Sequence, residues 1–210
     1  MRLIVTTHGI GGAWGLKDSN VGTMKILGEE LTNNHFHDFE VYQFTYGPRG
    51  WFTAEKHSLY DAEHFAGYVR SLARRKGISP QDIDIIGHSN GCRVQWRAMS
   101  SLGLSVGNVL WLNPALNSDV NLSDCDFKSL TVLANKFDKA VWLGSIIPFH
   151  KFGLGGVKGF KDDEKDDRIN ILHIDRWAPL SSNHNYLFNE KHLPIVIRII
   201  SKIWKDEKKR

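Results

Sequence analysis

Short apolar runs alternate along this chain with longer segments in which apolar residues recur every three or four positions. The first pattern is typical of buried β-strands, and the second is typical of helices that bury one face. Predicted strands cover residues 3–7, 40–45, 83–87, 106–112, 130–134 and 169–174. Predicted helices cover residues 21–31, 58–76, 90–101 and 191–204.

The order of these elements predicts the fold class. Apolar strands that are separated by helices are typical of a parallel sheet covered on both faces and joined by right-handed crossovers. The last predicted helix fits this arrangement, because Val196, Ile197 and Ile200 share one face while Arg198 and Lys202 lie on another. We therefore predict an α/β fold with a mostly parallel sheet.

Length and charge limit the domain organisation and the partners. The chain has 210 residues, 41% of them hydrophobic, which is enough for one core and predicts a single domain over residues 1–210. The formal net charge is +4, and the charged C-terminal tail, residues 205–210, carries half of it. This modest charge does not favour nucleic-acid binding.

Residues 144–168 combine glycines with apolar side chains and lie between two predicted strands. We interpret them as a connector loop with a short helix or, alternatively, as a lid. Their second half, residues 161–168, carries charges of both signs and is expected to be a solvated loop rather than a metal site.

The cysteines and the start of the chain bear on its compartment. Two cysteines, Cys92 and Cys125, are fewer than a disulfide framework normally uses. The apolar run at residues 3–7 is too short for an export signal or a membrane span. We therefore expect a cytoplasmic protein without a transmembrane segment, in which Cys92 is a packing residue rather than a nucleophile.

The predicted strand at residues 83–87 runs directly into the sequence Gly-His-Ser-Asn-Gly at residues 87–91, and a helix follows. A Gly-x-Ser-x-Gly sequence between a strand and a helix is typical of a nucleophile elbow, a sharp turn that presents the serine. Gly87 and Gly91 would avoid collisions across this turn, while Ser89 would adopt a strained backbone. The pattern predicts Ser89 as the nucleophile of a serine hydrolase.

A histidine downstream of Ser89 is the expected base. Ligands bind beyond the carboxyl ends of the strands in open parallel sheets, and after such an elbow the acid and then the base follow along the chain. His173 lies inside a predicted strand, His192 opens the last helix, and His150 precedes the last strand. His184 lies in the loop between the last strand and the last helix and is the predicted base.

The predicted acid is Asp138, which follows the strand at residues 130–134 in its first turn. Asp119, one strand earlier, is the alternative. The carboxylate is needed to fix the tautomer of the imidazole and to stabilise its charged form.

The first predicted strand ends in His-Gly-Ile-Gly-Gly at residues 8–12. Glycines let backbone N–H groups approach a ligand closely, and such groups form an oxyanion hole when they point at a developing alkoxide. A phosphate-binding loop is the alternative, but the Gly-x-Gly-x-x-Gly spacing of dinucleotide sites is not present here. We interpret residues 8–12 as an oxyanion loop in which His8 is a hydrogen-bonded structural residue.

These two motifs, in this order, resemble those of the α/β-hydrolase superfamily, specifically its lipase- and esterase-like members, and the resemblance covers nearly the whole chain. In that superfamily two strands usually precede the strand before the oxyanion loop, whereas here that strand comes first. The resemblance therefore implies a minimal α/β-hydrolase fold with about six strands and helices on both faces. It implies Ser89, Asp138 and His184 as nucleophile, acid and base, the N–H groups of Ile10 and Asn90 as oxyanion donors, and neither cofactor nor metal.

The implied reaction is hydrolysis of an ester or thioester of a small apolar or acyl substrate through an acyl-enzyme intermediate. Trp14, Trp51, Trp142 and Trp177 each follow a predicted strand within a few residues and are expected to line the substrate site. Peripheral contact with lipid is compatible with this substrate class. An amidase with the same residues and a hydrolase-fold binding protein without turnover are the alternatives, and the oligomeric state stays open.

Overall fold

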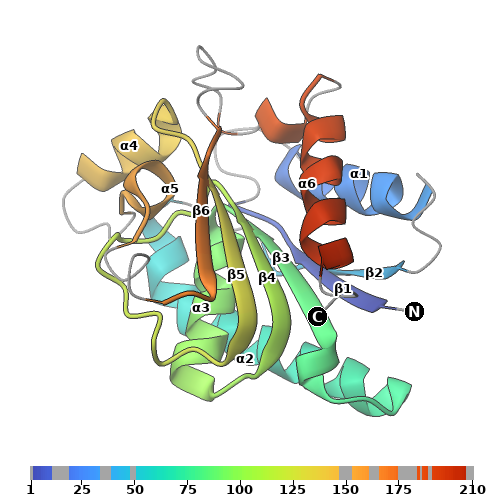
Figure 1. Ribbon diagram of the computed structural model, residues 1–210. Helices are drawn as coiled ribbons and strands as arrows, with labels where there is room; N and C mark the ends of the chain where they lie inside the picture. The colour runs from blue at the N-terminus through green and yellow to red at the C-terminus, as the bar shows by residue number, and fades with distance from the viewer. Residues whose placement is uncertain are drawn as a thin grey trace.

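One parallel sheet organises the protein. The computed structural model describes residues 2–10, 19–33, 39–47, 51–146, 153–160, 166–174, 184, 186–188 and 191–206. In order across the sheet, the strands are β2 (Phe39–Phe44), β1 (Arg2–Thr7), β3 (Ile83–His88), β4 (Val106–Leu112), β5 (Phe127–Ala134) and β6 (Ile169–His173) (Figure 1). All neighbouring pairs are parallel, so the predicted parallel sheet of about six strands is confirmed.

Helices cover both faces of this sheet, as predicted (Figure 1). Helices α1 (Ser19–Asn33) and α6 (Leu193–Asp206) pack on one face, and α2 (Trp51–Lys76) and α3 (Asn90–Leu102) pack on the other. Along β1, Leu3 and Val5 belong to the core under α2 and α3, whereas Ile4 belongs to the core under α1 and α6. The central strands β1, β3 and β4 are mostly apolar because both of their faces are buried, whereas the edge strands β2 and β6 are partly exposed.

Four shorter helical segments complete the described structure. They are the 3₁₀ turns Pro80–Asp82 and Tyr186–Phe188 and the helices α4 (Lys139–Ile146) and α5 (Gly155–Lys158).

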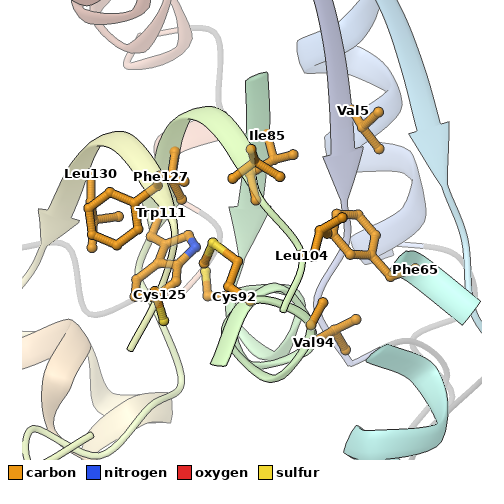
Figure 2. Close-up of a cluster of buried hydrophobic side chains, with 14 of the residues drawn as sticks. Val5, Phe65, Ile85, Cys92, Val94, Leu104, Trp111, Cys125, Phe127 and Leu130 are labelled. Atoms are coloured by element: carbon orange, nitrogen blue, oxygen red, sulfur yellow. The ribbon is translucent and has the colours of Figure 1, made fainter. Parts of the chain in front are cut away.

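The larger core lies between the sheet and α2 and α3. In Figure 2 the indole of Trp111 lies among Cys92, Cys125 and Phe127, which belong to the same buried cluster. The Trp111 Nε1–H donates to Gln95 Oε1 at 3.0 Å, so its one polar atom is satisfied. Burial raises the pKa of the Cys92 thiol well above its usual value and that of Cys125 to about 12. Both thiols are free, and these raised pKa values fit packing residues rather than nucleophiles.

Two helices differ from the sequence-based expectation. Helix α2 begins at Trp51 rather than at residue 58. Among the described side chains of its first turns, those that face inward are Ala54 and Ser58, which are small, so the apolar spacing typical of a helix is weak there. Helix α4 is not predicted by the pattern, because apolar residues lie on its buried side at Val141 and on its exposed side at Trp142.

Part of the predicted connector or lid is packed against the body of the protein. Within residues 153–160, Val157 and Phe160 are buried, and the Phe160 ring meets Trp111 edge-on at 5.8 Å. A Cβ on Gly156 would lie 2.5 Å from the carbonyl oxygen of Pro114, so this segment lies directly on the turn after β4. These contacts fit the connector interpretation, while movement of the segment as a lid stays a prediction.

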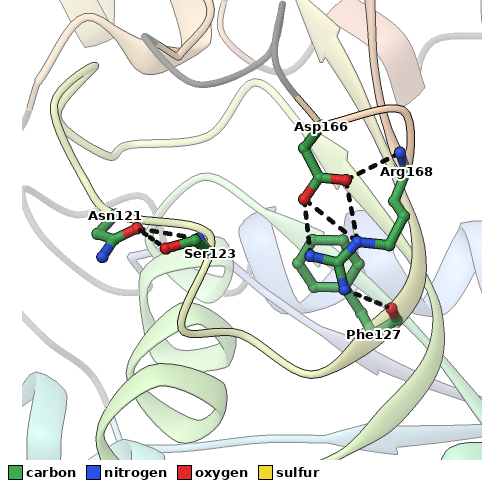
Figure 3. Close-up of polar contacts among 5 residues, drawn as sticks. All are labelled: Asn121, Ser123, Phe127, Asp166 and Arg168. Carbon is green, nitrogen blue, oxygen red and sulfur yellow. Dashed lines mark hydrogen bonds and ion pairs between the residues drawn. The ribbon is translucent and has the colours of Figure 1, made fainter.

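Residues 166–168, at the end of this connector, contact β5 where β6 begins. The Arg168 Nη2 atom lies 2.6 Å from Asp166 Oδ2, and the Arg168 guanidinium lies over the Phe127 ring at 4.6 Å (Figure 3). Figure 3 also shows Asn121 Oδ1 accepting hydrogen bonds from the N–H and hydroxyl of Ser123, which closes a turn between β4 and β5. The last residues of the charged stretch are therefore structural, and residues 161–165 lie outside the described residues.

Helix α6 continues through Lys205 and Asp206, the first two residues of the predicted charged tail. Residues 207–210 lie outside the described part of the chain. Within that part, no helix has the length and apolar character that crossing a bilayer requires.

Candidate active site

The loops after β1 and β3 meet at the carboxyl edge of the sheet. The chain leaves β1 through α1 to reach β2 on one side, whereas β3 lies on the other side of β1. Such a reversal of direction opens a crevice between the two strands, and this is where ligands bind in open parallel sheets. A Cβ built on Gly9 would lie 2.8 Å from the Cβ of Ser89, so the structure puts the two predicted motifs side by side.

Ser89 occupies the turn between β3 and α3 with φ of 55° and ψ of −121°. A non-glycine residue in such a conformation stores about 1–3 kcal/mol of strain and persists only where its surroundings hold it. The Ser89 N–H donates to Leu112 O at 3.0 Å, and its carbonyl oxygen accepts from the N–H groups of Cys92 and Ala115, each at 3.1 Å. The serine therefore has the strained strand-to-helix geometry of a nucleophile elbow.

Close packing surrounds the glycines on either side of Ser89, and at Gly91 the neighbouring atoms are backbone atoms. A Cβ on Gly91 would lie 2.5 Å from the carbonyl oxygens of Thr7 and His8, which are backbone atoms. A Cβ on Gly87 would lie 2.7 Å from Gln95 Oε1. The absence of a side chain at Gly91 lets α3 approach the end of β1, and its absence at Gly87 leaves room for Gln95 of α3.

Asp138 and His184 lie together beyond β5. The His184 Nδ1 atom is 2.6 Å from Asp138 Oδ2, and the carboxylate is fully buried. The other oxygen, Oδ1, accepts from the N–H groups of Ala140 and Val141 at 3.1 Å each, which caps α4 and stabilises the negative charge. Because Nδ1–H donates to the carboxylate, Nε2 is the basic atom of the ring, as a general base requires.

The alternative acid, Asp119, lies elsewhere. It is exposed and lines a cavity of about 300 Å³ between α2, α3 and residues 116–121. Ser89, Asp138 and His184 are not among the residues that line this cavity. Among the described residues, the carboxylate that meets His184 is that of Asp138.

A buried arginine supports the elbow from the side of α2. Arg93 is only 2% exposed, pairs with Glu55, and donates to Ala115 O through Nε at 3.3 Å and Nη2 at 3.0 Å. Since the Ala115 N–H in turn donates to the Ser89 carbonyl, the ion pair is linked to the nucleophile turn. Burial lowers the pKa of Arg93 to about 10, which leaves the side chain charged at neutral pH.

The described part of the predicted oxyanion loop, residues 8–10, is anchored by His8. Its Nδ1–H donates to Gly9 O at 2.6 Å, and its Nε2 accepts the Tyr46 N–H at 3.3 Å. Burial lowers the pKa of His8, which fits this neutral tautomer. His8 is hydrogen-bonded as predicted, and its purely structural role stays a prediction. Asn90 is the first residue of α3, a position whose N–H has no partner within a helix.

Two further residues that the sequence analysis does not single out hold the site together. Tyr46 follows β2, and its hydroxyl lies 3.1 Å from Asn90 Nδ2. Asn113 follows β4 with φ of 46°, and its Nδ2 donates to the carbonyl oxygen of His184 at 2.9 Å, which ties the base to the sheet. An asparagine before Pro114 at a strand end is a turn signal that points to Asn113. No comparable signal marks Tyr46.

His88, directly before Ser89, is fully buried beside the candidate base. Its ring centroid lies 4.9 Å from that of His184 and 4.9 Å from that of Phe188. Burial is the main cause that lowers the pKa of His88 well below its usual value, and the nearby His184 and His8 rings act in the same direction. His88 is therefore neutral in the folded protein.

The lowered pKa values of His8 and His88 predict a loss of stability on mild acidification. Below their unfolded pKa of about 6.5 the unfolded chain binds protons that the folded chain does not, so stability is complete above that pH and falls below it. The loss is expected to reach up to about 1.4 kcal/mol per pH unit for each histidine. Urea unfolding at pH 7.5 and 5.5 measures it.

One variant and one control distinguish the contribution of these two histidines to the pH dependence of stability from that of the other histidines. The variant His88→Phe is expected to lose part of the pH dependence, whereas His173→Gln, at an exposed position, keeps all of it. Equal free energies of unfolding at both pH values would contradict the neutral state of His8 and His88.

The structure describes one side chain of the four predicted substrate-binding tryptophans. The Trp142 side chain is 52% exposed on α4, and the backbone N–H of Trp142 donates to the backbone carbonyl of Asp138 at 3.0 Å, one helical turn from the candidate acid. Trp51 is the first residue of α2, and its side chain, like Trp14 and Trp177, lies outside the described residues. Within the described ranges, no three His, Cys, Asp or Glu side chains gather to hold a metal ion.

Solved structures share this fold at low sequence identity. No protein-family model and no curated protein matches the sequence. Among solved structures, the chain is similar to esterase PE8, with a TM-score of 0.59 and 12% identity over 96% of this chain and 92% of that one. It is also similar to the Francisella virulence factor BioJ, with a TM-score of 0.53 and 11% identity over 96% of this chain and 77% of that one. The lin2722 product of Listeria innocua gives a TM-score of 0.51 and 11% identity over 93% and 92%.

The structural similarity establishes the fold, although the sequence identities are only 11–12%. A single parallel sheet with helices on both faces, carrying a strained serine at a strand-to-helix turn, matches the arrangement expected from the two sequence motifs. The chain has the α/β-hydrolase fold.

Proposed function

We propose that this protein is a serine hydrolase that cleaves esters of small apolar or acyl substrates through Ser89, His184 and Asp138. The observation that carries the proposal is the buried Asp138 carboxylate 2.6 Å from His184 Nδ1, in a chain whose Ser89 has the backbone of a nucleophile elbow. A buried charge without a catalytic or structural partner is unfavourable, and here the partner is an imidazole.

The proposed reaction runs in two halves. His184 Nε2 takes the proton of the Ser89 hydroxyl while Oγ attacks the carbonyl carbon of the ester, and the tetrahedral intermediate collapses as the alcohol leaves with that proton. Water then attacks the acyl-enzyme and gives a proton to Nε2, and Nε2 passes this proton to Ser89 Oγ as the bond between Oγ and the acyl carbon breaks and the carboxylic acid is released. Asp138 stays ionised throughout and stabilises the imidazolium that forms in each half.

The N–H groups of Ile10 and Asn90 are the proposed oxyanion donors. Ile10 directly follows the Gly9 residue that contacts Ser89, and Asn90 is the residue after the nucleophile at the start of α3. Donors from these two segments are fixed before the substrate arrives, which is what makes such stabilisation effective.

Exposed aromatic side chains favour an apolar or acyl substrate. Phe137 and Trp142 flank the candidate acid and are 42% and 52% exposed. They offer exposed apolar surface on the segment that contains the candidate acid, which is compatible with an apolar substrate and with peripheral contact with lipid. The similarity to a protein named an esterase supports an ester substrate over an amide, although thioesters would use the same residues.

A fluorophosphonate probe and a series of p-nitrophenyl esters test the proposal. We expect the probe to modify Ser89, as mapped by mass spectrometry of the digested protein, and the esters to be hydrolysed with a preference that changes with acyl length. Heat-denatured protein is the control for labelling that does not depend on folding. Labelling at another residue, or no labelling of a folded protein that hydrolyses no ester, would favour the alternative of a binding protein without turnover.

A further inference from the structure

We infer that Tyr46 is a positioning residue that holds the two oxyanion donors in a fixed relation to each other. The inference rests on the proposed function and concerns the segments that carry Ile10 and Asn90. Tyr46 comes from the end of β2, a third part of the chain that contributes none of the proposed nucleophile, acid, base or donors.

The hydroxyl of Tyr46 joins the oxyanion loop to the start of α3. It accepts a hydrogen bond from Asn90 Nδ2 at 3.1 Å. Its own proton is donated to the loop, where the carbonyl oxygens of His8 and Gly9 lie at 2.9 Å and 3.1 Å. One hydroxyl therefore bridges the residue before Ile10 and the side chain of the residue after the nucleophile.

The rest of Tyr46 fixes the loop from its other side. The Tyr46 ring stacks on the His8 ring, with centroids 4.3 Å apart and planes inclined by 14°. The Tyr46 N–H donates to His8 Nε2, and His8 Nδ1–H donates to Gly9 O. The loop is thus held by the backbone, the ring and the hydroxyl of one residue, and the hydroxyl also reaches Asn90 of α3.

This bridge matters because the strand ladder ends before the donors. The last register pair between β1 and β3 is Thr7 with Gly87, and both Ile10 and Asn90 lie beyond it. Their relative position is then set by loop contacts instead of strand hydrogen bonds. Since a displacement of about 1 Å can lower a catalytic rate by about 100-fold, a bridge between the two segments acts on the transition state more than on substrate binding.

The test is Tyr46→Phe, which removes the bridging oxygen and keeps the ring that stacks on His8. The matched control is Tyr42→Phe, the same change on the same stretch of chain, where the hydroxyl bonds to Glu40 instead. For an ester substrate we expect Tyr46→Phe to lower kcat by about 10- to 100-fold, less than the loss of a whole oxyanion donor, with little change in KM. Affinity for an alkyl boronic acid, which forms a tetrahedral adduct with the serine, should fall by a similar factor.

The route through Asn90 is tested by a double-mutant cycle. Asn90→Ala keeps the backbone N–H and removes the amide that meets Tyr46. If the bridge is the cause, the double variant should lose little more than either single variant. Additive losses would overturn the bridge, and so would a Tyr46→Phe protein with unchanged kcat or with a raised KM alone.

Amide hydrogen exchange separates this inference from the proposed function. Peptides that cover residues 8–10 and 90–92 should exchange faster in Tyr46→Phe than in Tyr42→Phe or the unaltered protein. If the unaltered protein hydrolysed no ester and resisted the fluorophosphonate probe, the proposed function would fail, and unchanged exchange would overturn the positioning role independently. Faster exchange with unchanged kcat in an active enzyme would also overturn it.

Discussion

Replacing Ser89 by alanine is expected to lower kcat/KM for an activated ester by about four to six orders of magnitude. No other described hydroxyl at the elbow takes its place, because β3 and α3 present Ser89 alone at this turn. Stability should change little, since the Ser89 hydroxyl makes no capping hydrogen bond to α3. Steady-state kinetics with p-nitrophenyl esters, together with urea unfolding, measures both quantities.

The control for this substitution is Ser101→Ala. Ser101 lies exposed in the last turn of the same helix, so its loss removes a hydroxyl from α3 without touching the elbow. We expect wild-type kinetics from this variant. Substantial turnover by purified Ser89→Ala protein would refute the assignment of the nucleophile.

Substitutions at Asp138 should separate its catalytic role from its structural role. In Asp138→Asn, the side-chain oxygen still accepts from the N–H groups of Ala140 and Val141, so the cap of α4 survives. The new amide, however, donates toward His184 Nδ1 and forces the ring proton onto Nε2, the atom that has to receive the serine proton. We expect kcat to fall by about 10⁴-fold with a small change in unfolding free energy.

In Asp138→Ala both functions are lost. The cap of α4 disappears, which costs about 0.5–2 kcal/mol, and His184 loses the group that orients it. Asp119→Asn is the matched control, since Asp119 is the other carboxylate that sequence reasoning offers as the acid and it is exposed. If Asp119→Asn impaired kcat more than Asp138→Asn, the acid would have been assigned to the wrong residue.

Much of the fold follows from local sequence. Strands buried on both faces are mostly apolar, and this signal places β1, β3 and β4 within a residue or two. Helix α6 is equally readable, because Val196 and Ile200 repeat at helical spacing on its buried side. The start of α2 is harder to read, since Ala54 and Ser58 are the inward-facing residues among the side chains described there.

The nucleophile turn is the part of the candidate site that sequence predicts best. Its requirements are local: a strained residue needs small neighbours, and the structure gives Gly91 a backbone contact that excludes any Cβ. The acid and base are more distant along the chain, yet the rule that ligands bind beyond the carboxyl ends of strands narrows the base to His184 and the acid to Asp138 or Asp119. The structure then brings these two side chains within 2.6 Å.

The sequence by itself determined the α/β fold class, the elbow at Ser89 and the chain order of the three candidate catalytic residues. Tertiary structure alone decided which carboxylate meets His184, that Asn113 holds the loop of the base, and that Tyr46 joins Asn90 to the oxyanion loop. The physical reason is that strands and turns follow from patterns among neighbouring residues. Hydrogen bonds between residues many positions apart depend instead on how the sheet orders its strands, and no local pattern encodes that order.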